Sequence, residues 1–204
     1  MSQIALPLET GANGPSRIVI GNANQAALEA ISAASSWPFR TAILAGPPRS
    51  GKSLIAKWFQ AASDGEAIDD ADQLDETELF HRWNRAQEDA APLLLITTLR
   101  EAGWQITLPD LASRLSAALH LEIGVPDDTM MAELILLYAE MRRLPLGLDA
   151  AAYLAARGER SHVMAERLVE TIDRLGMERK APPGMAICRE ALELLMGPEE
   201  PRLI

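Results

Sequence analysis

The residues whose types and spacing could do chemistry form one continuous segment, and they are Gly46, Pro47, Pro48, Arg49, Ser50, Gly51, Lys52 and Ser53. Their order matches the pattern G-x-x-x-x-G-K-[ST]. The two glycines let backbone N–H groups wrap a phosphate that any Cβ would hold off. The lysine can then reach the β- and γ-phosphates, and the last serine is placed to ligate Mg²⁺. The segment therefore predicts binding of a nucleoside diphosphate or triphosphate.

The segment is flanked by the two elements that such a loop needs. The apolar run 41–45 before it predicts a buried strand, and residues 54–60 after it predict a helix. The positive end of that helix would face the bound anion. The alternative is an ordinary glycine turn between a strand and a helix, and the complete order of strand, loop and helix favours the phosphate loop.

Further alternation of strands and helices predicts a parallel sheet. We expect Asn22 to cap a helix that runs through residues 25–31 into Ser35. Residues 67–70 predict a second strand with an acidic end, followed by a helix over 76–88 and a buried strand over 93–98. The fold class is therefore α/β.

From Asp127 onward no strand is predicted, and apolar residues recur at helical spacing. The pattern predicts helices over 128–143, 148–156, 161–176 and 184–196. The expected organisation is a flexible tail over 1–15, a nucleotide-binding α/β domain over 16–126 and a small helical lid domain over 127–204.

Composition excludes several classes of function. Among 204 residues, 48% are hydrophobic, which is enough for a buried core, and the net charge of −10 opposes direct binding to DNA. No apolar run approaches the roughly 20 residues that a membrane span needs, so we expect a cytoplasmic protein. The single Cys188 cannot form an internal disulfide or a cysteine metal cluster.

Together, these motifs resemble the AAA+ ATPase superfamily, and three segments resemble its DnaA/Hda branch: 16–25, 68–74 and 108–115. The resemblance implies that ADP or ATP is bound with Mg²⁺, held through Ser53 and Asp69, with Asp70 beside it. It also implies that Arg114 acts as an arginine finger on nucleotide held by a neighbouring subunit. On the residues alone, Arg114 could instead be a surface arginine paired with Asp110.

The same resemblance assigns sensor residues, and it marks a departure from the branch. Thr97 and Thr98 are the candidates for sensor 1, and Arg167 and Arg160 are the candidates for sensor 2. Too few residues lie between Gln60 and Asp69 for the strand and helix that this branch inserts there. We therefore expect a sheet whose edge strand is shortened or missing.

The tail begins with residues 3–8, which resemble the sliding-clamp-binding motif at the start of Hda proteins. Gln3 would make polar contacts, and Leu6 and Leu8 would fill an apolar pocket on the clamp. The alternative is a disordered tail with scattered apolar residues.

The resemblance implies a regulator that is tethered to the DNA polymerase III sliding clamp (its beta subunit) and stimulates hydrolysis of the ATP bound to the replication initiator DnaA. Two other interpretations stay open: a stand-alone AAA+ ATPase or loader, and an adaptor that uses nucleotide only to stabilise its fold. Hydrolysis by the chain itself and a homo-oligomer are also left open.

Overall fold

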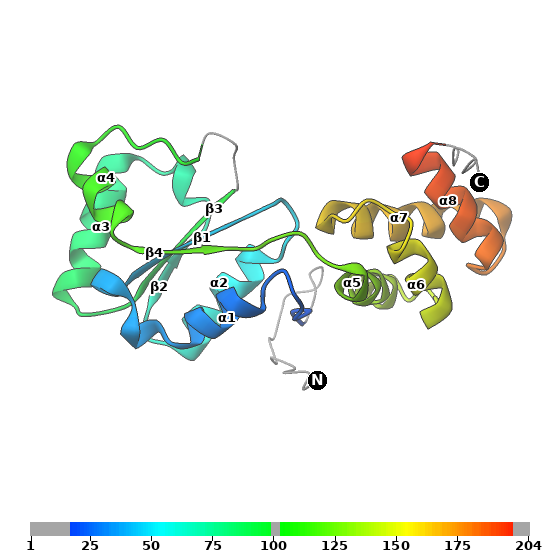
Figure 1. Ribbon diagram of the computed structural model, residues 1–204, viewed down its shortest axis with the longest axis horizontal. Helices are drawn as coiled ribbons and strands as arrows, with labels where there is room; N and C mark the ends of the chain where they lie inside the picture. The colour runs from blue at the N-terminus through cyan, green and yellow to red at the C-terminus, as the bar shows by residue number, and fades with distance from the viewer. Residues whose placement is uncertain (1–16, 99–102, 198–204) are drawn as a thin grey trace, which may run out of the picture. The chain divides into compact units, whose positions relative to one another are not determined.

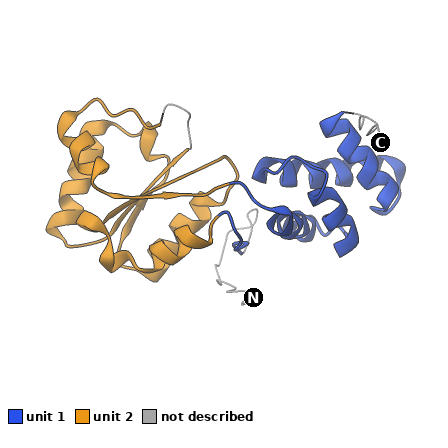
Figure 2. Cartoon of the chain, viewed as in Figure 1, with its two compact units in different colours: residues 1–23, 125–204 blue, residues 24–124 orange. Residues whose placement is uncertain are grey.

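The computed structural model describes residues 17–98 and 103–197, and these form two compact units. One unit is 24–124, and the other combines 125–204 with the segment before residue 24 (Figure 2). The predicted clamp-binding residues Gln3, Leu6 and Leu8 lie outside the described residues.

The unit 24–124, called the sheet unit, contains a four-stranded parallel sheet in the order β2-β3-β1-β4 (Figure 1). Its strands are β1 (Thr41–Gly46), β2 (Glu66–Ile68), β3 (Leu93–Thr98) and β4 (Leu119–Glu122). The central strands pair with Gly46 opposite Thr98, so the carboxyl ends of β1 and β3 are level with each other. The predicted α/β fold is confirmed.

Helices cover both faces of this sheet. In Figure 1, α3 (Glu76–Glu88) and α4 (Pro109–Ser116) lie on one side, and α1 (Gln25–Ser32) and α2 (Lys52–Ala62) lie on the other. Alternate residues of the strands therefore enter different cores. The core on the first side contains inward-facing residues of three strands and of both helices, among them Ile43, Ile68, Leu93, Leu95, Leu79, Trp83, Leu111 and Leu115.

The edge of the sheet has the predicted departure. Only three residues, 63–65, connect α2 to β2, so no further strand and helix are inserted there. β2 itself lies at the edge of the sheet, where Ile68 pairs with Leu95 of β3. β2 is also shorter than β1 and β3, at three residues. The carboxylates of Asp69 and Asp70 directly follow it.

The other unit, called the helical unit, is made of helices, as its sequence pattern predicted. It contains α5 (Asp128–Met141), α6 (Leu148–Ala155), α7 (His162–Arg179) and α8 (Met185–Met196). The Asp127 side chain caps α5 by accepting a hydrogen bond from the Met130 N–H, and Ser161 caps α7 in the same way. None of the described helices is long and apolar enough to cross a membrane.

One predicted cap was wrong. Asn22 does not cap α1, whose N-cap residue is Asn24 and has no side-chain capping bond. Instead, the Asn22 amide donates to the Val125 carbonyl at 3.0 Å and accepts from the Asp127 N–H at 2.9 Å. These bonds satisfy the amide across more than 100 positions of sequence, which a local pattern does not reveal.

Candidate phosphate-binding site

The loop between β1 and α2 has the backbone that its glycines allow. Gly51 has φ +84°, in the left-handed region that side chains disfavour. A Cβ on Gly46 would lie 3.0 Å from both the Ile123 Cβ and the Ser50 Oγ, so this position is limited by space. The two glycines thus serve two different physical needs of one loop.

Lys52 closes this loop from the first position of α2. Its Nζ donates hydrogen bonds to the carbonyl oxygens of Gly46 and Pro47, both at 2.9 Å. Burial lowers the pKa of Lys52 below its ordinary value, while the charges of Asp69, Asp70 and Asp72 oppose that change. The structure therefore brings the loop lysine and the acidic strand end into one electrostatic neighbourhood.

Two serines of the loop have different environments. Ser50 is buried, and its Oγ has no hydrogen-bond partner among the described residues. Ser53 is exposed in the first turn of α2, a helix whose start has no side-chain cap. An uncapped helix start leaves backbone N–H groups available to an anion, and a buried hydroxyl favours a polar partner. Both features fit a phosphate.

The neighbouring strand ends supply further polar groups. Asp69 and Asp70 are exposed after β2, and the Asp70 N–H donates to the Asp69 carboxylate at 3.2 Å. Thr97 is buried, and its hydroxyl donates weakly to the Thr98 carbonyl at 3.4 Å. Thr98 is half-buried directly beside Gly46 in the sheet.

Magnesium could use this site only together with other ligands. In the parts of the chain that are described, no three His, Cys, Asp or Glu side chains gather closely enough to hold a metal ion. Ser53 and Asp69 offer a hydroxyl and a carboxylate, which are oxygen ligands that suit Mg²⁺, and Mg²⁺ commonly takes the rest from phosphate and water. The donor set fits an ion that arrives with a nucleotide.

Arg114 lies in the last turn of α4, and its contacts are with α3. The guanidinium carbon is 4.3 Å from the centroid of the Phe80 ring and 4.4 Å from that of Trp83. Its Nη1 donates to the Asn84 Oδ1. This partner is an amide on another helix and not Asp110, the partner in the alternative interpretation of Arg114.

The two candidates for sensor 2 lie in the helical unit. Arg160 donates to Asp128 at 2.8 Å, and Arg167 is exposed on α7. Arg160 therefore already has a carboxylate partner in its own unit. Their assignment to the nucleotide stays a prediction.

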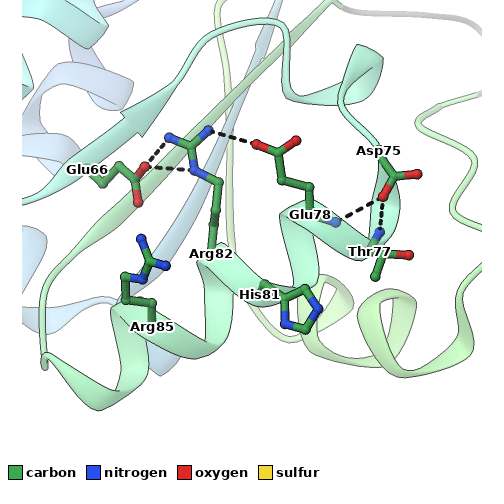
Figure 3. A pocket seen from close by; sticks show the side chains of 7 residues that line it. All are labelled: Glu66, Asp75, Thr77, Glu78, His81, Arg82 and Arg85. Atoms are coloured by element: carbon green, nitrogen blue, oxygen red, sulfur yellow. Dashed lines mark hydrogen bonds and ion pairs between the residues drawn. The ribbon is translucent and has the colours of Figure 1, made fainter.

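A surface pocket lies elsewhere on the sheet unit, between α3 and β2 (Figure 3). In it, Arg82 pairs with Glu66 and lies 3.9 Å from Glu78, while Asp75 accepts the N–H groups that begin α3. These charges are occupied with each other and with the backbone. None of the predicted site residues lines this pocket.

A glycine-rich loop between β1 and α2 at the carboxyl edge of a parallel sheet, followed in the chain by a helical unit, is the arrangement of a P-loop fold. Among solved structures, the chain resembles domain III of the Thermotoga maritima replication initiation protein DnaA, with a TM-score of 0.70 and 16% identity over 88% of this chain and 95% of that one. It also resembles the Thermotoga maritima RuvB Holliday junction branch migration motor, with a TM-score of 0.61 and 24% identity over 89% and 73%.

A third similar structure is the replication initiator DnaA bound to AMPPCP and single-stranded DNA, with a TM-score of 0.61 and 17% identity over 79% of this chain and 66% of that one. No family model and no curated protein matches the sequence. At these identities the likeness concerns the fold, which is similar to that of domain III of DnaA.

Proposed function

We propose that the chain binds ATP or ADP with Mg²⁺ in the loop 46–53 and acts as a regulator of the replication initiator DnaA. The observation that carries the nucleotide site is the combination of loop, lysine and acids. The Lys52 Nζ donates to the carbonyls of its own loop, and the charges of Asp69 and Asp70 act on its ammonium group. On phosphate binding, its ammonium would exchange these carbonyls for phosphate oxygens.

The choice of DnaA as partner rests on the fold and the sequence together. The fold matches domain III of DnaA over nearly the whole of that domain. The segment 108–115 resembles the DnaA branch segment that carries an arginine finger, which assigns this role to Arg114. We propose that Arg114 reaches the ATP held by DnaA in a mixed assembly, stimulates its hydrolysis and so lowers the competence for initiation.

The proposal includes a tether to DNA. Residues 3–8 resemble a clamp-binding motif, and the net charge of −10 disfavours direct contact with the phosphate backbone. A clamp loaded on DNA would hold the chain close to DnaA and raise the effective concentration of each for the other. Gln3, Leu6 and Leu8 would make this contact.

The experiment measures ATP hydrolysis by DnaA with and without this chain, in the presence of the beta clamp loaded on DNA. We expect the wild type to raise the rate, because an arginine on the developing charge of phosphoryl transfer is worth on the order of 10³-fold or more. Gln3→Ala and Arg114→Ala run beside it, and each should remove the stimulation for its own reason. Gln3→Ala should recover at high concentration of the chain, whereas Arg114→Ala should not.

Other outcomes would redirect the proposal. Substantial ATP turnover by the isolated chain, lost in Lys52→Ala and Asp69→Ala, would instead favour a stand-alone ATPase or loader. If Lys52→Ala lowers thermal stability while recruitment to clamp or DnaA survives, nucleotide serves the fold and the chain is an adaptor. Full stimulation by Arg114→Ala would refute the finger assignment.

A further inference from the structure

Arg114 is held by three side chains from one face of α3. Phe80, Trp83 and Asn84 follow each other at i, i+3 and i+4, so a helix presents them side by side. The two rings lie 4.3 and 4.4 Å from the guanidinium carbon, well within the roughly 6 Å over which a ring face attracts a cation. Asn84 accepts from one end of the guanidinium.

Phe80, Trp83 and Asn84, together called the Arg114 holder, are uncharged, unlike the carboxylates that pair with other arginines. Carboxylates neutralise several arginines of the described chain, including Arg17, Arg82, Arg142, Arg160 and Arg179. Within the described residues, the ring contacts and hydrogen bond of the Arg114 guanidinium are with two aromatic rings and a neutral amide. These contacts orient the guanidinium without cancelling its positive charge. A cation held in this way keeps its attraction for an external anion.

The helix that carries Arg114 is also fixed at its other end. The Glu76 carboxylate accepts from the Thr107 N–H, at 2.9 and 3.1 Å to its two oxygens, from the Thr107 hydroxyl at 2.8 Å and from the Leu108 N–H at 2.6 Å. Because Glu76 begins α3 and Leu108 is the N-cap of α4, the two helices are joined at both ends of α4. α4 therefore has a defined place on α3.

We infer that Phe80, Trp83 and Asn84 are positioning residues that hold the Arg114 guanidinium pre-oriented for a triphosphate presented by another molecule. This inference rests on the proposed function. The rings restrict the plane of the guanidinium, and Asn84 restricts rotation within that plane. A pre-oriented cation acts on charge that develops in the transition state without the cost of being ordered at that moment.

The test uses Phe80→Leu and Asn84→Ala in the full chain, with Phe80→Tyr as the conservative variant and Arg85→Ala as a control for an exposed charge on the same helix. The readout is DnaA ATP hydrolysis as the concentration of each variant is varied. We expect the maximal stimulated rate to fall on the order of 10-fold in the first two, because a misplacement of about 1 Å can cost 10²-fold. The half-saturating concentration should stay unchanged, and Phe80→Tyr and Arg85→Ala should retain the rate.

A second measurement reports the holder without any activity. In NMR spectra of the wild type, ring currents from Phe80 and Trp83 should displace the Arg114 Nε–H signal, and Phe80→Leu should return it toward the position of an exposed arginine. Thermal unfolding followed by circular dichroism establishes whether each variant is folded. If Phe80→Leu does not fold, Asn84→Ala tests the positioning role in its place.

The outcomes separate this inference from the proposed function. If Arg114→Ala keeps full stimulation, the finger assignment fails and takes the inference with it. If Arg114→Ala abolishes stimulation while Phe80→Leu and Asn84→Ala stimulate fully with the displaced signal lost, the holder is purely structural. In that case the inference is overturned and the proposed function stands.

Discussion

At the scale of single residues, the phosphate loop shows how a motif position can be required by backbone conformation alone. Gly51 has open space around the position of a Cβ, with nothing within 4 Å, yet its φ is +84°. An L-residue in the left-handed region costs roughly 1–2 kcal/mol. The restriction at Gly51 therefore comes from strain, whereas the restriction at Gly46 comes from its neighbours.

We predict that Gly51→Ala destabilises the protein by about 1 kcal/mol or more and weakens ATP binding, because the loop relieves the strain by moving. Gly51→Asn is the matched control, since asparagine tolerates the left-handed region better than alanine does. Urea denaturation and nucleotide titration measure the two effects. Equal stability of Gly51→Ala and Gly51→Asn would contradict this explanation.

A second residue-scale prediction concerns the thiol of Cys188. This residue is fully buried in α8, and burial raises its pKa above the ordinary value of 9.0. Because the thiolate is the reactive form, the folded protein should react very slowly with iodoacetamide at pH 8. Mass spectrometry should find rapid alkylation only after unfolding in urea. Rapid alkylation of the native protein would show that α8 opens readily.

At the scale of elements, the junction between α3 and α4 depends on one carboxylate. The backbone hydrogen bonds from Thr107 and Leu108 lower the pKa of Glu76 below its ordinary value of 4.5. A carboxyl group with a lower pKa in the folded protein stabilises it fully above the unfolded pKa, and this contribution disappears as the pH falls through the folded pKa. The junction should therefore weaken in acid, below about pH 4.5.

The corresponding prediction compares the wild type with Glu76→Gln. At pH 7 the variant should have the lower melting temperature, because an amide accepts these N–H groups less strongly than a carboxylate does. The difference should shrink as the pH is lowered below 4.5. Melting curves between pH 7 and pH 3.5 measure it, and a difference that is constant with pH would show that the Glu76 charge is not involved.

The elements that the sequence predicted are those with strong local patterns. Apolar runs or helical periods occur in β1, β3, α3 and the helices of the helical unit, and all of these elements are present. β4 was missed, because it has four residues that alternate between half-buried Leu119 and Leu121 and exposed His120 and Glu122. Its pairing with β1 comes from residues about 80 positions earlier, which no local pattern contains.

The candidate site divides in the same way. The loop 46–53 could be singled out because phosphate binding requires fixed residue types at fixed spacing in one segment. The place of Asp69 and Asp70 at the end of a strand was predicted, whereas their electrostatic effect on Lys52 comes from the structure. The partners of Arg114 did not, because Phe80, Trp83 and Asn84 lie 30 or more positions away and read from the sequence as ordinary residues of an amphipathic helix.

At the scale of the whole molecule, the chain passes between its two units twice, near residues 23–24 and again near 124–125. Next to these two crossings, Asn22 is hydrogen-bonded to the backbone of Val125 and Asp127, so the two segments of chain are linked within the helical unit. The segment before α1 also pairs with α5 through Arg17 and Glu140, at 3.0 Å. The start of the described chain is therefore part of the helical unit.

We predict that Asn22→Ala lowers the free energy of unfolding by about 1–2 kcal/mol, because two hydrogen bonds to backbone groups are lost together. Gln25→Ala is the control, since Gln25 is an exposed amide that donates to Glu29 in the next turn of the same helix. Urea denaturation compares the two variants. Equal effects would mean that the Asn22 bonds add nothing beyond a surface amide.

The double passage has a mechanical consequence for any anchor attached to the first residues. A pull on the segment before Arg17 is received first by α5, through the Arg17–Glu140 ion pair and the Asn22 amide, and not by the sheet that carries the phosphate loop. The sheet unit is connected to the helical unit by two segments of chain rather than one.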